Sequence, residues 1–170
     1  MTLAYTMMPG KGDMDLLLAQ LAQRLSARGV TCAGVVQRNV DCGPERKCDM
    51  DLTVLHSGEV LRISQSLGVG ARGCRLDPAA LEQAVAATSQ ALDSADLLLV
   101  NKFGKHEAQG RGFRPLIGEA MAADLPVLCG LNGANLPAFQ EFTGGLAVEV
   151  APDLDALMAW AEAQISQPAG

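Results

Sequence analysis

The sequence predicts one α/β domain with a mainly parallel sheet, and three observations lead to this prediction. The 170 residues have the length of a single domain. A short apolar run at 2–7, a Gly-rich loop and a helical pattern closed by Gly29 precede an almost uncharged strand at 30–37. This order is the βαβ unit, which places parallel strands side by side. Residues 97–100, Leu-Leu-Leu-Val, form a second buried strand.

The composition is that of a globular protein, with 49% hydrophobic and 19% charged residues. The net charge of −6 argues against nonspecific binding to nucleic acid or to anionic membranes. No stretch reaches the roughly 18 uncharged apolar residues that span a bilayer. The N-terminal residues lack the basic start and the apolar core of a signal peptide. We therefore expect a cytoplasmic protein with no nucleic-acid partner and no membrane insertion.

Periodicity and turn residues predict the elements of the first half. Asp13 is placed as the N-cap of the first helix, whose leucines repeat at helical spacing. A polar loop is expected at 38–48. Two alternating segments at 49–56 and 59–66 are separated by a Ser-Gly pair, which predicts a peripheral antiparallel hairpin inserted in the domain. A Gly- and Arg-bearing stretch follows at 67–77.

In the second half, Asp77 as N-cap and Pro78 in the first turn predict a helix to about Ser94. The strand at 97–100 is expected to lie at the centre of the sheet, and a loop to occupy 101–112. The remaining expected elements are a helix at 113–123, a strand at 125–131, a helix at 135–142, a strand at 147–150 and a helix at 152–166.

The five cysteines are odd in number and widely spaced, and none forms a C-x-x-C pair. Reduced thiols in a cytosolic protein explain this pattern. Cys42 and Cys48, with Asp49 and Asp51, fit no standard zinc module. We therefore expect no metal site.

The first candidate site is the loop at 8–13, which contains Gly10, Lys11, Gly12 and Asp13. Its glycines let backbone N–H groups approach an anion at a helix N-terminus. The phosphate-binding motif reads G-x-x-x-x-G-K-[ST]. Lys11 follows Gly10, but Gly12 stands where Ser or Thr is needed, and no glycine precedes Gly10 at the required distance. A tight turn, an altered anion site and intact nucleotide hydrolysis stay open as alternatives.

The second candidate site is the loop after the buried strand, which reads Asn-Lys-Phe-Gly-Lys-His-Glu at 101–107. The guanine-reading signature N-K-x-D needs a carboxylate where this chain has Gly104. In triphosphatases, acidic residues after a buried strand hold Mg²⁺ and activate water. Asn101 and Lys102 occupy those positions, which disfavours hydrolysis, and Glu107 is left as a carboxylate on the rim. Solvated loop charges are the plain alternative.

Basic side chains near these loops suit an anionic ligand, because guanidinium groups bind oxyanions in a bidentate manner. Lysines and arginines gather around the two loops although the chain is acidic overall. We expect an anion to bind between 8–13 and 101–112. The expected donors are Lys11, Lys102 and Lys105, joined by Arg75 or Arg111.

Several segments together resemble the Domain of Unknown Function 2478 family, over about residues 10–160. The most specific segment is Asn-Lys-Phe-Gly-Lys-His-Glu-Ala-Gln-Gly-Arg-Gly at 101–112. The family is similar to P-loop nucleoside triphosphatases of the thermophilic phosphatase type, and its members are often encoded beside molybdate transport genes. The resemblance implies a three-layer, P-loop-NTPase-like α/β fold. In those triphosphatases the motif at 101–107 reads D-E-x-G-x-x-E, so Gly104 and Glu107 match while both acidic positions differ.

Three functions are carried forward. The first is a nucleotide- or oxyanion-binding protein on a scaffold with a degenerate Walker motif, linked to molybdate or molybdenum uptake or use. Its ligand would be a nucleotide with Mg²⁺, or molybdate. The alternatives are an active Mg²⁺-dependent nucleoside triphosphatase and a protein-interaction subunit without a small ligand. Candidate protein partners are a second copy of the chain and components of a molybdate transporter.

Overall fold

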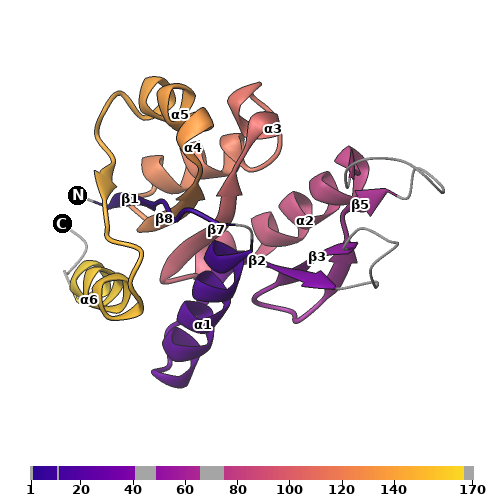
Figure 1. The fold of residues 1–170 in the computed structure, drawn as a ribbon. Coiled ribbons are helices and arrows are strands. Elements are labelled where there is room, and N and C mark those ends of the chain that lie inside the picture. Colours follow the sequence, from indigo (N-terminus) through magenta and orange to yellow (C-terminus); the bar gives the residue numbers. More distant parts are fainter. Residues whose placement is uncertain (1, 11, 41–48, 66–74, 167–170) are drawn as a thin grey trace.

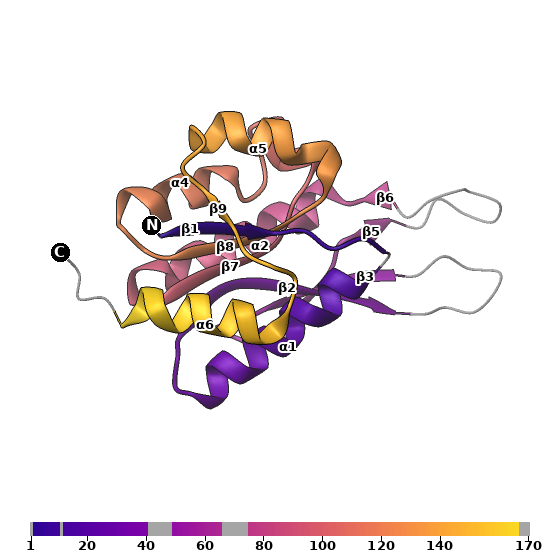
Figure 2. The same ribbon diagram turned by 60° about the vertical axis from the view of Figure 1, so that its left-hand side comes forward.

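A computed structural model describes residues 2–10, 12–40, 49–65 and 75–166. Its centre is a seven-stranded sheet in the order β4-β3-β2-β7-β8-β1-β9. Helices cover both faces of this sheet, which gives three layers (Figures 1 and 2). Within the described residues, no helix has the length and apolar character needed to cross a membrane.

Five strands of the sheet run parallel to one another. They are β1 (Leu3–Thr6), β2 (Cys32–Val40), β7 (Leu97–Phe103), β8 (Val127–Leu131) and β9 (Val148–Glu149). An antiparallel hairpin of β3 (Asp49–Val54) and β4 (Val60–Arg62) extends the sheet beyond β2. Two predictions are therefore confirmed: the Leu-Leu-Leu-Val strand is central, and the hairpin lies at the edge.

The helices divide between the two faces. One face is covered by α1 (Asp13–Ala27) and α6 (Leu154–Ile165), the other by α2 (Pro78–Ala91), α4 (Arg114–Ala122) and α5 (Leu136–Thr143). Short turns of helix complete the chain at η1 (Leu92–Ser94), α3 (Lys105–Ala108) and η2 (Gly133–Asn135).

A separate hydrophobic core lies on each face of the sheet. On the α1 face, Leu18, Leu21 and Leu25 are fully buried against the sheet. On the opposite face, the rings of Phe103 and Phe139 meet edge to face, with centroids 5.1 Å apart. Each fully buried leucine stabilises the fold by about 1.5–3 kcal/mol. The leucine spacing that predicted α1 is thus the spacing that faces the core.

Two predicted boundaries were wrong because strand pairing overrides local polarity. The loop expected at 38–48 begins later, since β2 continues to Val40 by pairing residues 38–40 with β3. The strand expected at 59–66 is interrupted at Ile63. Beyond that residue, β5 (Ser64–Gln65) pairs with β6 (Arg75–Leu76) in a separate two-stranded sheet.

Two further details concern the ends of helices. The expected loop at 101–112 contains the end of β7 and the short helix α3. Asp13 does not cap α1: Gly12, in a left-handed conformation, is the N-cap, and Asp13 is the first helical residue. Asp77 caps α2 as predicted, and its side chain accepts hydrogen bonds from the backbone N–H groups of Ala79 and Ala80.

Candidate functional site

The candidate site lies at the carboxyl edge of the sheet, where β1 leads into α1 and β7 leads into α3. α1 covers one face of the sheet, whereas α4, which follows β7 and α3, packs on the other. The chain therefore diverges to opposite faces at this edge. Open α/β sheets collect ligands at such a point.

The loop before α1 turns sharply at two glycines. Gly10 has φ +111° and Gly12 has φ +84°, values that favour glycine because side chains are strained there. A Cβ at Gly10 would collide with the carboxylate of Asp13. The Asp13 side chain is therefore folded back over the loop. Lys11, predicted as an anion donor, lies outside the described residues.

The start of α1 gives a register for the phosphate-binding motif that differs from the one predicted. The motif joins a strand to a helix, and its lysine follows the second glycine directly. Gly12 immediately precedes α1, so it corresponds to that glycine. In this register Asp13 stands at the lysine position, Met14 at the Ser/Thr position and Met7 at the first glycine.

A hydrogen-bond network joins α1, β2 and β7 beside this loop. Asn101 is buried, and its Nδ2 donates to Asp15 Oδ1 at 2.7 Å. Asn101 Oδ1 accepts the backbone N–H of Gln37 at 2.9 Å. Asp15 Oδ2 accepts from Asn39 Nδ2 at 2.9 Å, and Gln37 Nε2 donates to Asn39 Oδ1 at 2.9 Å. Both oxygens of Asp15 and both ends of the Asn101 amide are thus engaged.

The network contains three residues that sequence reasoning missed: Asp15, Gln37 and Asn39. Asp15 lies in the first turn of α1, and its position in the sequence does not distinguish it from a solvent-exposed carboxylate at a helix N-terminus. Gln37 and Asn39 fell at or beyond the predicted end of β2. The parallel pairing of β2 with β7 is what brings them beside Asn101.

A second group of predicted residues lies at the turn between β7 and α3. Glu107 is 4% exposed, and its Oε1 accepts the backbone N–H of Gly104 at 3.0 Å. Burial raises the pKa of its carboxyl from 4.5 to about 7, partly offset by the N–H groups of Gly104 and Phe113 and by Lys102. Lys102 itself is exposed. Glu107 is therefore an interior carboxylate, whereas the sequence suggested one on the rim.

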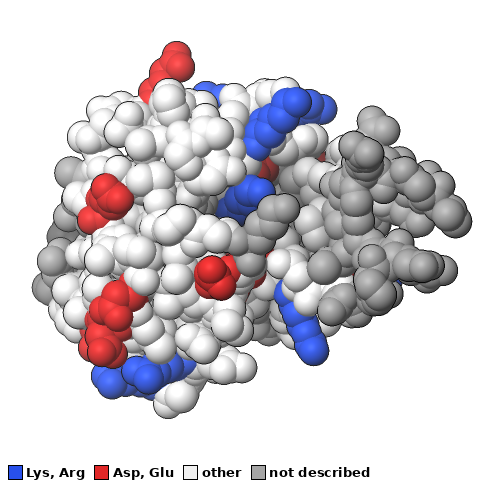
Figure 3. All heavy atoms as spheres, in the orientation of Figure 1, with Lys and Arg blue, Asp and Glu red and all other residues white. Residues whose placement is uncertain are grey.

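The remaining predicted donors are less closely grouped. Lys105 is exposed on α3, and Arg111 donates to Gln109 Oε1 at 2.6 Å. Arg75 belongs to β6, and its side chain is not among those described. Among the described residues drawn in Figure 3, the Lys and Arg side chains of this face form no continuous patch. The structure therefore joins Asn101 to α1 by a hydrogen bond, and it leaves the placement of Lys11 and of the Arg75 side chain outside the described residues.

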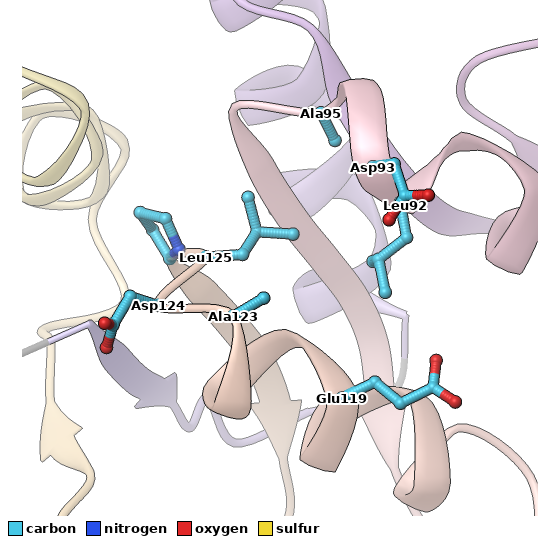
Figure 4. A pocket seen from close by; sticks show the side chains of 8 residues that line it. Leu92, Asp93, Ala95, Glu119, Ala123, Asp124 and Leu125 are labelled. Atoms are coloured by element: carbon cyan, nitrogen blue, oxygen red, sulfur yellow. The ribbon is translucent and has the colours of Figure 1, made fainter. Parts of the chain in front are cut away.

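The described residues hold no candidate metal cluster, and a cavity lies elsewhere in the fold. Among the described residues, no group of three or more His, Cys, Asp or Glu side chains could hold a metal ion. Cys32 and Cys129 carry free thiols; Cys42, Cys48 and Cys74 lie outside the described residues. A cavity of about 340 Å³ lies at the amino end of β8, away from the candidate site (Figure 4). It is lined by Leu92, Asp93, Ala95, Glu119, Ala123, Asp124, Leu125 and Pro126.

Comparisons with known proteins bear on the family and the fold. The model of the family described as "Protein of unknown function (DUF2478)" matches residues 3–160. A curated relative, Molybdenum import ATP-binding protein ModC 2 of Bradyrhizobium diazoefficiens, is 38% identical over 149 residues. The match covers 87% of this chain but only 17% of the relative's length.

Two solved structures share the fold. The first is THEP1 from the hyperthermophile Aquifex aeolicus, with a TM-score of 0.69, 18% identity, and coverage of 95% of this chain and 99% of that one. The second is a human cancer-related nucleoside triphosphatase, with a TM-score of 0.67, 19% identity, and coverage of 99% and 100%. The prediction of a three-layer, P-loop-NTPase-like α/β fold is confirmed.

Proposed function

The chain belongs to the DUF2478 family, and from this premise we propose that it binds a nucleotide or a small oxyanion without efficient triphosphate hydrolysis. The proposed site is the carboxyl edge of the sheet, between loop 7–12 and the β7–α3 turn. Three features support binding: the P-loop-NTPase-like fold, the positive-φ glycines before α1, and the similarity to a relative that is named as an ATP-binding protein. Loops that lead into a helix N-terminus favour anions.

The observation that carries the proposal is the hydrogen bond from Asn101 to Asp15. Triphosphatases place carboxylates after the buried strand so that Mg²⁺ and the attacking water are held. Here the position is an amide whose nitrogen and oxygen are both used within the protein. Mg²⁺ prefers free carboxylate and phosphate oxygens. The residues present therefore do not fit a Mg²⁺ ion of the P-loop type.

The loop before α1 also differs from a phosphate-binding loop in a way that disfavours binding of a triphosphate. Asp13 stands where the motif has lysine, and its carboxylate covers Gly10. A carboxylate there repels a triphosphate, with about four negative charges, more than a dianion, because Coulomb repulsion scales with charge. A small oxyanion or a nucleotide of low charge therefore suits the loop better than a nucleoside triphosphate.

Molybdate is the oxyanion that we propose first. The curated relative is a molybdenum import ATP-binding protein, and the family resemblance implies genes that lie beside those of molybdate transport. A role in molybdenum uptake or use follows as part of the proposal. The expected protein partners, a second copy of the chain and components of a molybdate transporter, stay predictions.

Isothermal calorimetry with ATP, ADP, AMP, molybdate, tungstate and sulfate tests this function. We expect dissociation constants in the micromolar to millimolar range for at least one anion, and weaker binding of ATP than of AMP. Phosphate release from ATP with Mg²⁺ is measured in parallel. Rapid Mg²⁺-dependent release would favour the triphosphatase, and no binding of any anion at millimolar concentration would favour the interaction subunit.

A further inference from the structure

Lys102 and Glu107 approach each other across Gly104, which has no side chain to separate them. A Cβ at Gly104 would lie 3.6 Å from Lys102 Cε and 3.6 Å from Glu107 Oε1. The aliphatic part of Lys102 and the Glu107 carboxylate therefore both lie against Gly104. The ammonium group and the carboxylate lie close enough for Lys102 to act on the charge of Glu107, and the attraction lowers the pKa of that carboxyl.

Glu107 needs a counter-charge because its own hydrogen bonds are incomplete. Oε1 accepts the Gly104 N–H, but among the described residues no group makes a well-formed hydrogen bond with the buried Oε2. The Phe113 N–H lowers the pKa of the carboxyl less than the Gly104 N–H does. Gly112 packs so closely that a Cβ there would collide with Oε2. A buried carboxylate with an unsatisfied oxygen is costly unless a cation is near. Lys102 is the described cation whose charge acts on Glu107.

We propose that Glu107 is a positioning residue, which holds the Lys102 ammonium at the β7–α3 turn in competition with an anion bound at the carboxyl edge. The inference rests on the proposed function, because Lys102 is one of the anion donors expected there. One ammonium carries a single positive charge, so it cannot neutralise both the Glu107 carboxylate and a bound anion at once. Ionised Glu107 therefore weakens anion binding, and neutral Glu107 frees Lys102 for the ligand.

The competition makes anion binding depend on pH. Burial raises the pKa of Glu107 to about 7, so the carboxyl is ionised above that value and neutral below it. Anion affinity is then expected to rise as pH falls through about 7. The groups that face Glu107 are Lys102 on β7, Glu82 on α2 and the thiol of Cys129 on β8. His106 on α3 is the next group, with Nε2 3.7 Å from Glu82 Oε1.

The first test needs no ligand, so it is independent of the proposed function. The pKa of Glu107 is measured by carbon-13 NMR of its carboxyl in the parent, Lys102→Met and Lys105→Met. Because Lys102 stabilises the ionised form, Lys102→Met should raise the pKa of Glu107. Lys105→Met, which removes an equal charge from α3, should leave it nearly unchanged. An unaltered pKa in Lys102→Met would overturn the inference.

The second test measures calorimetric affinity for sulfate and molybdate, both dianions across neutral pH, in the parent, Glu107→Gln and Glu119→Gln. Glutamine keeps the acceptor for Gly104 and removes the charge. We expect Glu107→Gln to bind about fivefold more tightly than the parent above neutral pH, at the low end of typical coupling, and to lose the pH dependence. Glu119, at the opposite end of the sheet, should have no effect. The same pH dependence in Glu107→Gln and parent would show that another group titrates and would reject the proposal.

The experiments distinguish failure of the proposed anion-binding function from failure of the proposed competition between Glu107 and the anion. If the parent binds neither anion, the proposed function fails, and the NMR titration still decides whether Lys102 and Glu107 are coupled. If the parent binds an anion but the Glu107 variant behaves like the parent, the site stands and the competition does not. Folding of each variant is checked by its denaturation midpoint.

Discussion

The Asn101 amide donates a 2.7 Å hydrogen bond to the Asp15 carboxylate, and this bond ties the end of β7 to the first turn of α1. Asp15 accepts from Asn39 with its other oxygen, so the bond also reaches β2. An amide and a carboxylate are complementary here. Two carboxylates in the same place would repel each other unless a cation or a proton lay between them.

The first prediction tests this complementarity. Asn101→Asp places a second carboxylate beside Asp15 and should lower the free energy of unfolding by about 2–3 kcal/mol at neutral pH, because a buried donor is replaced by an unpaired charge. The double variant Asn101→Asp with Asp15→Asn restores one amide and one carboxylate. Urea denaturation should show most of the stability recovered. An additive loss in the double variant would mean that the two side chains are not coupled.

The second prediction compares a glycine that has no room for a Cβ atom with one that has open space there. Gly34 in β2 has φ +122°, and a Cβ there would collide with the carbonyl oxygen of Leu99 on β7. Gly34→Ala should therefore destabilise the fold severely, by about 3 kcal/mol or more, since both strain and overpacking oppose it. Gly118 in α4 has open space at its Cβ position. Gly118→Ala should raise stability by up to about 1 kcal/mol.

The third prediction concerns hydrolysis of nucleoside triphosphates. With Asn101 at the position of a Mg²⁺-binding carboxylate and Asp13 at the position of the motif lysine, turnover should stay far below the typical enzyme value of about 10 per second. Removing a single transition-state stabiliser commonly costs about 10²–10³ in rate. Steady-state phosphate release with ATP and GTP, with and without Mg²⁺, measures this. A typical enzyme rate in the purified parent, absent from Lys102→Ala, would refute it.

The fourth prediction follows from the raised pKa of Glu107. The folded pKa of about 7 exceeds the ordinary 4.5, so the folded state binds the proton more tightly than the unfolded state does. Stability from this group is fully present below about pH 4.5 and is lost as pH rises through about 7, by roughly 2–3 kcal/mol. Denaturation at a series of pH values should show this slope in the parent and a flatter profile in Glu107→Gln. Parallel profiles would contradict it.

The fold could be predicted from the sequence because local patterns and tertiary burial agree in most elements. The leucine spacing of α1 and the uncharged run of β7 are both satisfied by the core. The end of β2 at Val40 could not be predicted, because Arg38 and Asn39 are polar. Residues 38–40 become part of the strand only by pairing with β3. The sequence predicted Asp13 as the N-cap of α1, yet Gly12, in a left-handed conformation, is the N-cap.

The candidate site was predicted less completely, for a related reason. Asn101, Gly104 and Glu107 stand in one short segment, which the motif pattern could identify. Asp15 reaches the site because α1 packs beside β7, and Asn39 reaches it because β2 extends past its predicted end. The local sequence pattern does not show such long-range contacts. The burial of Glu107 depends likewise on Gly112 and α2, which pack over it.

The fifth prediction concerns the two lysines of the β7–α3 turn. Lys102→Ala with Lys105→Ala should abolish binding of molybdate and sulfate at millimolar concentration, because it removes two exposed cations of the β7–α3 turn. Both side chains are exposed, so the free energy of unfolding should change by no more than about 0.5 kcal/mol for each where Glu107 is neutral, and by more for Lys102→Ala only where Glu107 is ionised. The matched control is Arg24→Ala with Arg28→Ala, which removes the same charge near the far end of α1. Equal loss of binding in both double variants would indicate a general effect of net charge. Undiminished binding in the lysine variant would move the site away from this turn.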